Sequence, residues 1–199
     1  MRVLRRFALL LSLLAGLGGC AGVDVDAPAS PAGKLRYAVE LFDRQDMPVP
    51  AERLIRDAID IYRETNDQIG LAEAYRTYGF FFGSRSILKW SNHYLEHGFL
   101  DKSASLDFNL LKSIEYFEKA QAIFTTHKRF DKLVNVNLNI GFTYARLGNQ
   151  AAACRAFETS LANNRDDLRE NPDAKPLLPR GFESFDAYVA DLKKQNGCA

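Results

Sequence analysis

This chain of 199 residues has almost no excess charge of either sign, because 26 Lys and Arg residues are balanced by 25 Asp and Glu residues. A general nucleic-acid-binding protein needs a basic excess to displace counterions from phosphates, so the balance excludes nucleic acid as a partner. The chain also lacks a strong compositional bias: 47% of its residues are hydrophobic and 26% are charged, which argues against disordered and fibrous proteins. We therefore expect one globular domain.

Motifs for catalysis are missing as well. The sequence contains no glycine-rich phosphate-binding loop and no serine-nucleophile elbow. Aspartates such as Asp43 and Asp46 are numerous, and we interpret them as solvated residues and helix caps. The sequence thus predicts neither an enzyme nor a protein that carries a cofactor.

The apolar run at residues 7–18 is too short to cross a bilayer, because a membrane-spanning helix requires roughly 20 apolar residues. Three arginines precede this run, and a charged start with a short apolar core is typical of a secretory signal. The run leads into Leu17, Gly18, Gly19 and Cys20. This ending resembles the lipobox of bacterial lipoproteins, which implies a signal peptide at residues 1–19 and a lipid anchor on Cys20. An ordinary signal peptide with an accidental cysteine is the alternative.

The residues after the cysteine bear on location. Residue 21 is Ala rather than Asp, which by resemblance to lipoproteins of Gram-negative bacteria implies the outer membrane, facing the periplasm. Residues 20–33 lack an apolar period and predict a flexible tether between the lipid and the folded domain.

The body of the chain repeats itself at an offset of 62 residues. The matched pairs are Ile55 and Phe117, Ala58 and Ala120, Tyr62 and Phe124, Leu71 and Leu133, Tyr78 and Ile140, Gly79 and Gly141, and Phe82 and Tyr144. These positions are small or apolar and are spaced by three and four, which is a helical period. The repeated unit is therefore predicted to be a pair of helices.

The last copy shows the pattern of this unit most clearly. It reads, in order, Ile140, Gly141, Tyr144, Leu147, Gly148, Ala153 and Phe157. The pattern resembles the tetratricopeptide repeat, in which small residues let the two helices approach and large ones fill the space between neighbours. The resemblance implies an all-α, short right-handed solenoid at 34–167, with repeats beginning at Ala32, Ala72 and Val134. Six extra residues between repeats are expected around 65–70 and 126–132.

Two segments stand outside the repeats. An insertion at 84–108 lengthens repeat two, and its apolar residues favour packing on the solenoid, although they can also anchor a partner. A Pro-rich linker and a final helix occupy 168–199. Ser184 is predicted to begin this helix and Gly197 to end it, with Phe185, Tyr188, Val189 and Leu192 on one face. We expect this helix to cap the last repeat.

Two cysteines remain besides Cys20. An oxidising compartment allows Cys154 and Cys198 to form a disulfide that fixes the last helix to repeat three. Two free thiols are the alternative, and the sequence leaves the choice open.

A pair of histidines is the one metal-like pattern. His93 and His97 stand one helical turn apart, with Glu96 between them. Zinc can use this spacing, but a catalytic site needs a third ligand, and the glutamate is not placed as in the His-Glu-x-x-His motif. We therefore expect no metal, and a metal-binding or enzymatic use of these residues is an alternative.

The resemblance to tetratricopeptide repeats also implies a concave groove lined by the first helix of each repeat. Asn amides can pair there with a peptide backbone, and Arg can hold a carboxylate. The predicted partner-binding residues are Arg76, Phe80, Asn135, Asn139, Phe142 and Arg146, with Trp90 from the insertion. A solvated groove without a ligand is the alternative.

These features together predict an envelope lipoprotein that binds a protein or peptide partner, as a scaffold or an assembly accessory similar to pilotin-like lipoproteins. An immunity lipoprotein that neutralises a periplasmic toxic effector is the alternative for the same scaffold.

Overall fold

The computed structural model describes residues 28–174 and 178–198. Of these residues 77% are helical and none forms a strand, which confirms the all-α class. The predicted signal peptide and Cys20 lie outside the described residues. Within the described part, no helix combines the length and the apolar character needed to cross a membrane.

The helices follow one another closely along the chain. They are α1 (Pro31–Val39), the π-helical turn η1 (Glu40–Arg44), α2 (Pro48–Glu64), α3 (Gln68–Gly83), α4 (Arg85–Lys89), α5 (Ser91–His97), the 3-10 turn η2 (Leu106–Phe108), α6 (Asn109–Thr126), α7 (Phe130–Arg146), α8 (Gln150–Glu170) and α9 (Phe185–Gln195).

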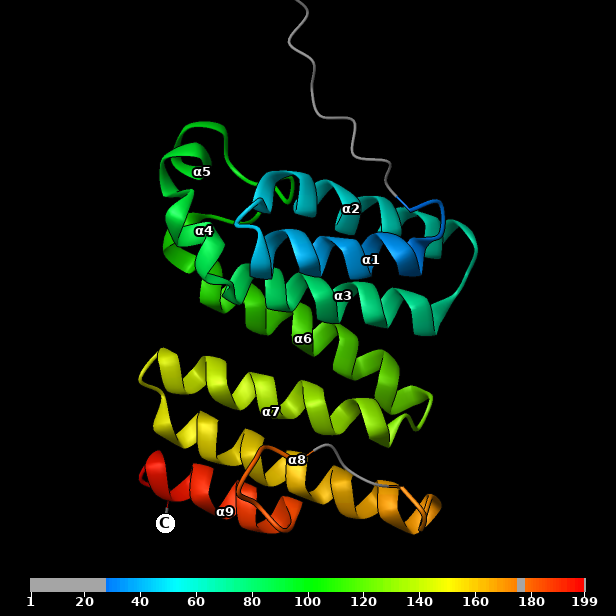
Figure 1. Cartoon of the computed structure of the whole chain (residues 1–199), viewed down its shortest axis with the longest axis vertical. Coiled ribbons are helices and arrows are strands. Elements are labelled where there is room, and N and C mark those ends of the chain that lie inside the picture. The colour runs from blue at the N-terminus through cyan, green and yellow to red at the C-terminus, as the bar shows by residue number, and fades with distance from the viewer. Residues whose placement is uncertain (1–27, 175–177, 199) are drawn as a thin grey trace, which may run out of the picture.

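From α3 onward the long helices are stacked in chain order along the longest axis of the molecule, and α1 and α2 lie together at one end of the stack (Figure 1). Helix α1 packs on α2, α2 on α3, α3 on α6, α6 on α7, α7 on α8, and α8 on α9. The short helices α4 and α5 lie beside the α1–α3 end of the stack, between α3 and α6 in sequence (Figure 1). Each long helix therefore buries apolar residues against the helices before and after it in this series.

Glycines set close approaches between helices, and the sequence repeat matches two of them. A Cβ atom on Gly79 of α3 would lie 2.7 Å from the Phe117 ring of α6. A Cβ atom on Gly141 of α7 would lie 2.4 Å from the Phe157 ring of α8. Any larger residue would push these helix pairs apart, so the close packing predicted at Gly141 is present.

The connections between the repeated units are short. The extra residues around 65–70 and 126–132 are only partly loop, because α3 already begins at Gln68 and α7 at Phe130. Each link turns at its middle residue, Asn66 or Lys128, with a φ of 56° or 51°. These two positions are 62 residues apart, so the offset seen in the sequence also repeats a backbone turn.

The predicted tether at 20–33 extends too far, because its last residues belong to the first helix. Helix α1 begins at Pro31, and Ser30 caps it by accepting a 3.1 Å hydrogen bond from the Gly33 amide. Proline fits the first helical position because its missing N–H has no partner there anyway. Gly33, expected in the tether, is a buried residue of the folded domain.

The last helix confirms the predicted boundaries. Ser184 accepts a hydrogen bond from the Ala187 amide at the start of α9, and Gly197 follows its end with a φ of 65°. Phe185, Val189 and Leu192 are buried against α8 residues that include Phe157. A disulfide joins Cys154 of α8 to Cys198, with their Cα atoms 5.7 Å apart. The question that the sequence left open is thus answered in favour of the bridge.

The insertion packs on the stack through three of its apolar side chains, as predicted, whereas Trp90 and Phe108 are 39% and 63% exposed. Ile87, Tyr94 and Phe99 are buried in the same cluster as residues of α1 to α3. The Tyr94 and Phe99 rings stack with centroids 4.2 Å apart, and Phe99 lies 5.2 Å from Phe82 of α3. Leu95, in contrast, is 68% exposed.

Candidate functional site

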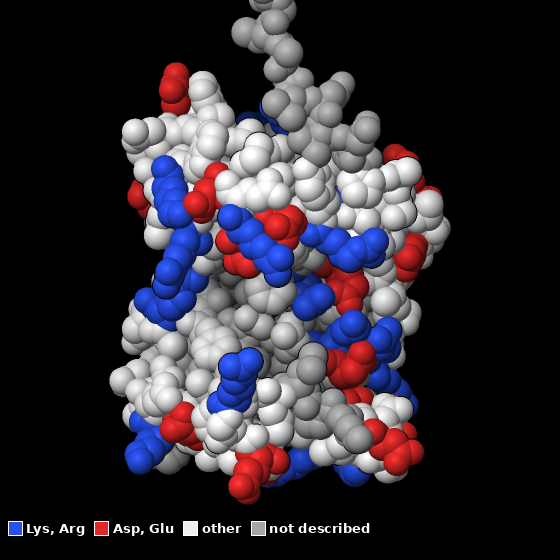
Figure 2. Space-filling model, in the orientation of Figure 1, with Lys and Arg blue, Asp and Glu red and all other residues white. Residues whose placement is uncertain are grey.

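Two adjoining hollows run along one side of α3, and we call them together the α3 groove. The larger has a volume of about 930 Å³ and lies between η1, α3 and α4. Its lining residues are Val39, Phe42, Asp43, Arg44, Asp46, Arg76, Thr77, Phe80, Gly83, Ser84, Arg85, Ser86 and Lys89. Figure 2 shows a recess on this face of the molecule, with Lys and Arg atoms along its left side.

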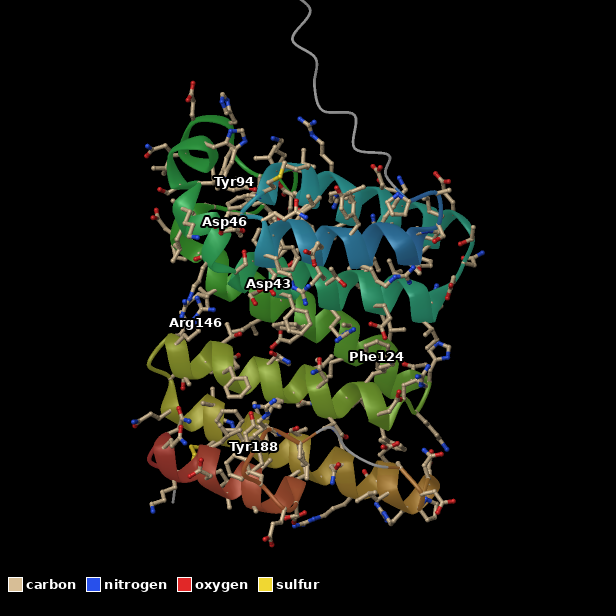
Figure 3. All side chains as sticks on the ribbon, in the orientation of Figure 1. Asp43, Asp46, Tyr94, Phe124, Arg146 and Tyr188 are labelled. Atoms are coloured by element: carbon tan, nitrogen blue, oxygen red, sulfur yellow. A yellow bond between two sulfur atoms is a disulfide. The ribbon has the colours of Figure 1, made fainter. Side chains whose placement is uncertain are left out.

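The smaller hollow has a volume of about 160 Å³ and lies between α3, α6 and α7. Its lining residues are Phe80, Gly83, Ser113, Phe117, Asn139, Phe142, Thr143 and Arg146. Phe80 and Gly83 line both hollows, so the groove continues past α3 from the α1 side to the α7 side. In Figure 3 the labelled Asp43 and Arg146 come from these two sides.

Arg76 is held in place near one part of the groove by three contacts. Its guanidinium pairs with Glu73 at 2.7 Å and donates a 3.0 Å hydrogen bond to Asn135 Oδ1 on α7. It also lies 5.5 Å from the centre of the Phe80 ring. Burial alone would raise the pKa of Glu73, but Arg76 and Lys132 lower it below its usual range. Glu73 is therefore ionised at neutral pH and keeps Arg76 oriented.

Arg146 bridges the other part of the groove. It donates a 2.7 Å hydrogen bond from a guanidinium nitrogen to the carbonyl oxygen of Gly83, at the end of α3. Asn139, two turns earlier on the lining face of α7, donates to the Asn135 carbonyl at 2.8 Å. Among the described residues, the Asn139 amide oxygen and most of the Arg146 donors have no hydrogen-bond partner, so a ligand can use them.

The start of the insertion forms another wall of the α3 groove. Helix α3 stops at Gly83, Ser84 is extended with a ψ of 154°, and α4 starts at once with Arg85. This abrupt change of direction brings Arg85 and Lys89, one helical turn apart, to the rim of the larger hollow. Lys89 forms an ion pair with Asp46.

Trp90 does not line either hollow. Its indole nitrogen donates a 2.7 Å hydrogen bond to the Asp46 carbonyl, while 39% of the residue is exposed. Trp90 therefore fastens α4 to the segment after η1. This contact supports the wall of the groove rather than extending its lining.

The structure brings most of the predicted binding residues to the α3 groove, but they line two different hollows. Arg76 and Phe80 line the larger hollow, whereas Asn139, Phe142 and Arg146 line the smaller one with Phe80. Asn135 lines neither and is occupied by Arg76.

The sequence missed the basic residues of the insertion, Arg85 and Lys89, and Arg44 of η1. Asp46, predicted to be a solvated residue or a helix cap, also lines the larger hollow and forms an ion pair with Lys89. The spacing of four between Arg85 and Lys89, which places both on one helix face, was the signal available in the sequence.

A buried carboxylate holds the insertion against the stack. Glu52 of α2 is 3% exposed, and its Oε1 accepts hydrogen bonds from the Tyr78 hydroxyl at 2.7 Å and the Leu100 amide at 2.8 Å. Burial raises the pKa of Glu52, although these hydrogen bonds oppose the shift. Among the many carboxylates of the chain, no sequence signal marked this one as buried.

The histidine pair lies on the surface of α5. The His93 and His97 rings have centroids 4.7 Å apart, and His97 Nε2 lies 3.8 Å from a Glu96 oxygen. In the described parts of the chain, no three or more His, Cys, Asp or Glu side chains gather as metal ligands would. His93 instead packs edge-on against Trp90 and Tyr94.

The α3 groove combines the apolar Phe80 ring with amide and hydroxyl groups and several guanidiniums, which can contact a ligand. No family model, curated protein or solved structure matches this chain.

Proposed function

We propose that this chain is a lipid-anchored, non-catalytic scaffold of the bacterial cell envelope, whose tetratricopeptide-like repeats bind a protein or peptide partner in the α3 groove. The observation that carries the proposal is the groove itself. A hollow of about 930 Å³ is of the size that usually holds a ligand, and apolar Phe80 lies beside hydrogen-bonding and charged groups.

The stacking of the helices supports the proposed solenoid. The helix pairs α3–α6 and α7–α8 each close around a glycine that faces a phenylalanine, and the two glycines are equivalent in the sequence repeat. A stack of such pairs leaves one helix of each pair on the groove side, which is how repeat proteins form extended binding surfaces. Helix α9 covers the apolar end that such a stack exposes.

The binding role is tested by photocrosslinking in cells that express the full chain. A photoreactive amino acid replaces Asp43, which is exposed and lines the groove, or Arg155, which is exposed on α8. We expect a discrete adduct from position 43 only. The adduct should disappear when Asn139→Ala, Phe142→Ala and Arg146→Ala are combined. Equal adducts from both positions, or an adduct that survives the triple variant, would contradict the proposal.

The anchor is tested separately. Cys20→Ser should abolish labelling by radioactive palmitate and release the protein from the membrane fraction, because the thiol is the expected acylation site. Ala21→Asp is the matched control: labelling should persist, while the protein moves from the outer to the inner membrane fraction. Persistent labelling of Cys20→Ser would disprove the anchor.

A further inference from the structure

The lining of the α3 groove is richer in cations than in carboxylates, although the whole chain is almost neutral. Among the described residues that line its two hollows, five side chains are basic and two are acidic. The basic ones are Arg44, Arg76, Arg85, Lys89 and Arg146, and the acidic ones are Asp43 and Asp46. The groove therefore concentrates positive charge that the rest of the surface compensates.

Three of the five cations already have a carboxylate partner. Arg44 pairs with Glu40, Arg76 with Glu73 and Lys89 with Asp46. Arg85 and Arg146 form no ion pair with the described residues of the chain. The positive charge available to a ligand is thus centred on these two arginines.

Gly83 lies between the two arginines along the groove. Arg85 follows it by two residues in the chain, and Arg146 donates to its carbonyl oxygen. The two residues belong to different hollows, which share Gly83 and Phe80. A ligand that crosses this point can meet both guanidiniums and the Phe80 ring.

The shape and chemistry of this place favour a peptide with carboxylates. A guanidinium presents a planar set of donors that matches a carboxylate in a two-point contact. Val39 and Phe80 offer apolar contact next to these donors, and Val39 is 38% exposed. A hollow of about 930 Å³ is much larger than a single small anion, and it fits a short chain segment.

We propose that the α3 groove binds an acidic segment of the partner protein, with carboxylates of that segment held by Arg85 and Arg146 and an apolar side chain against Phe80. The inference rests on the proposed peptide-binding function and adds the chemical class of the ligand. It also gives the insertion a role, because Arg85 lies outside the repeats.

Asp43 gives the proposal a second test. This carboxylate is exposed, lines the larger hollow and forms no ion pair with the described residues. It repels an acidic ligand, so its neutralisation should strengthen binding. A variant that gains affinity cannot be explained by misfolding.

The experiment is a selection of randomised twelve-residue peptides, displayed on phage, against the full-length protein in detergent. The same selection is run on Arg85→Gln/Arg146→Gln and on the control Arg53→Gln/Arg155→Gln, which neutralises two exposed arginines of α2 and α8 away from the groove. Peptides from the wild-type pool are then synthesised with their Asp and Glu residues kept or changed to Asn and Gln, and their affinities are measured.

We expect the wild-type and control pools to be enriched in Asp and Glu, and the Arg85→Gln/Arg146→Gln pool to lose this enrichment. Changing the acids to amides should weaken binding to the wild type by roughly tenfold and change binding to Arg85→Gln/Arg146→Gln much less. Asp43→Asn should bind the acidic peptides more tightly than the wild type does.

A pool without acidic enrichment, whose binding is nevertheless lost in Phe80→Ala, would overturn the acidic preference and leave the peptide-binding groove in place. An acidic pool that binds Arg85→Gln/Arg146→Gln as well as the wild type would also overturn the assignment. If no peptide binds above the level of a blank surface, both the acidic preference and the proposed binding function are wrong.

Discussion

The hydroxyl group of Tyr78 donates a 2.7 Å hydrogen bond to the buried carboxylate of Glu52, which joins α3 to α2 beneath the insertion. The same carboxylate oxygen accepts from the Leu100 amide, so one buried group fixes three segments of the chain. The insertion in turn carries Arg85 at the rim of the α3 groove. The geometry of the groove therefore depends on a hydrogen bond outside it.

Tyr78→Phe should lower the free energy of unfolding by about 1–3 kcal/mol, because it leaves a buried carboxylate with one donor fewer. Urea unfolding followed by circular dichroism measures this change. Tyr94→Phe is the matched control: the Tyr94 hydroxyl is buried and has no hydrogen-bond partner among the described residues, so its removal should be neutral or stabilising. Equal losses in both variants would show that the bond to Glu52 has no special weight.

The stability of Glu52→Gln relative to the wild type should depend on pH. Burial raises the pKa of Glu52 in the folded state above its ordinary value of 4.5, so the folded protein holds this proton more tightly than the unfolded chain. The resulting stability is complete below pH 4.5 and is lost as pH rises through the raised pKa. Glutamine keeps an acceptor for Tyr78 and does not titrate. Its unfolding free energy should therefore gain on that of the wild type as pH increases from 4 to 7.

For Glu73→Gln we expect the opposite pH dependence of the unfolding free energy relative to the wild type. Arg76 and Lys132 lower the Glu73 pKa despite burial, so its stabilising contribution is present above pH 4.5 and is lost as pH falls through the lowered pKa. This variant should approach the wild type in stability as the solution becomes more acidic. Parallel pH curves for the two variants would refute at least one of the two assignments.

Gly141→Ala should destabilise the protein by about 1–3 kcal/mol, although alanine is normally the better helix former. The added methyl group would lie 2.4 Å from the Phe157 ring, and the α7–α8 contact would have to open. A double-mutant cycle with Phe157→Leu is the check, using thermal or urea unfolding. The two changes should couple favourably because the smaller side chain makes room; strict additivity would mean that no steric conflict exists.

Removing the disulfide with Cys154→Ser/Cys198→Ser should lower the free energy of unfolding by about 2–4 kcal/mol, because the bridge restrains the unfolded chain. The bridged residues are 44 positions apart, so the disulfide closes a long loop of the chain. Dithiothreitol should lower the stability of the wild type to that of the double variant and leave the variant unchanged. A wild type insensitive to the reductant would show that the bridge contributes no stability.

The helices themselves were predictable because small and large apolar residues alternate at helical spacing, and because Ser184 and Gly197 mark the ends of the last helix. The shortness of the links between repeats has a physical reason that the extra residues did not reveal. Gln68 begins α3 after an Asp67 cap, and a single residue with positive φ, Asn66, is enough to reverse the chain. The tether was overextended because Pro31 can signal either a loop or a first helical turn.

The candidate site was only partly predictable. Phe80 and Arg146 follow from the repeat pattern, because their positions on the first helix of a repeat determine which way they face. Arg85 belongs to an insertion, whose direction is set by the extended Ser84 and by burial of Tyr94 and Phe99. Those tertiary contacts are not encoded in a local period. Glu52 shows the same limit, since its burial depends on the insertion that covers it.

Because of the disulfide between Cys154 and Cys198, the state of the protein depends on the redox conditions under which it is prepared. Protein made where thiols stay reduced has its last helix attached only by noncovalent contacts, whereas protein made in an oxidising environment has that helix covalently fastened. Two samples with identical sequence can thus differ in how firmly one end of the stack is closed, and measurements on them are comparable only when their oxidation states agree.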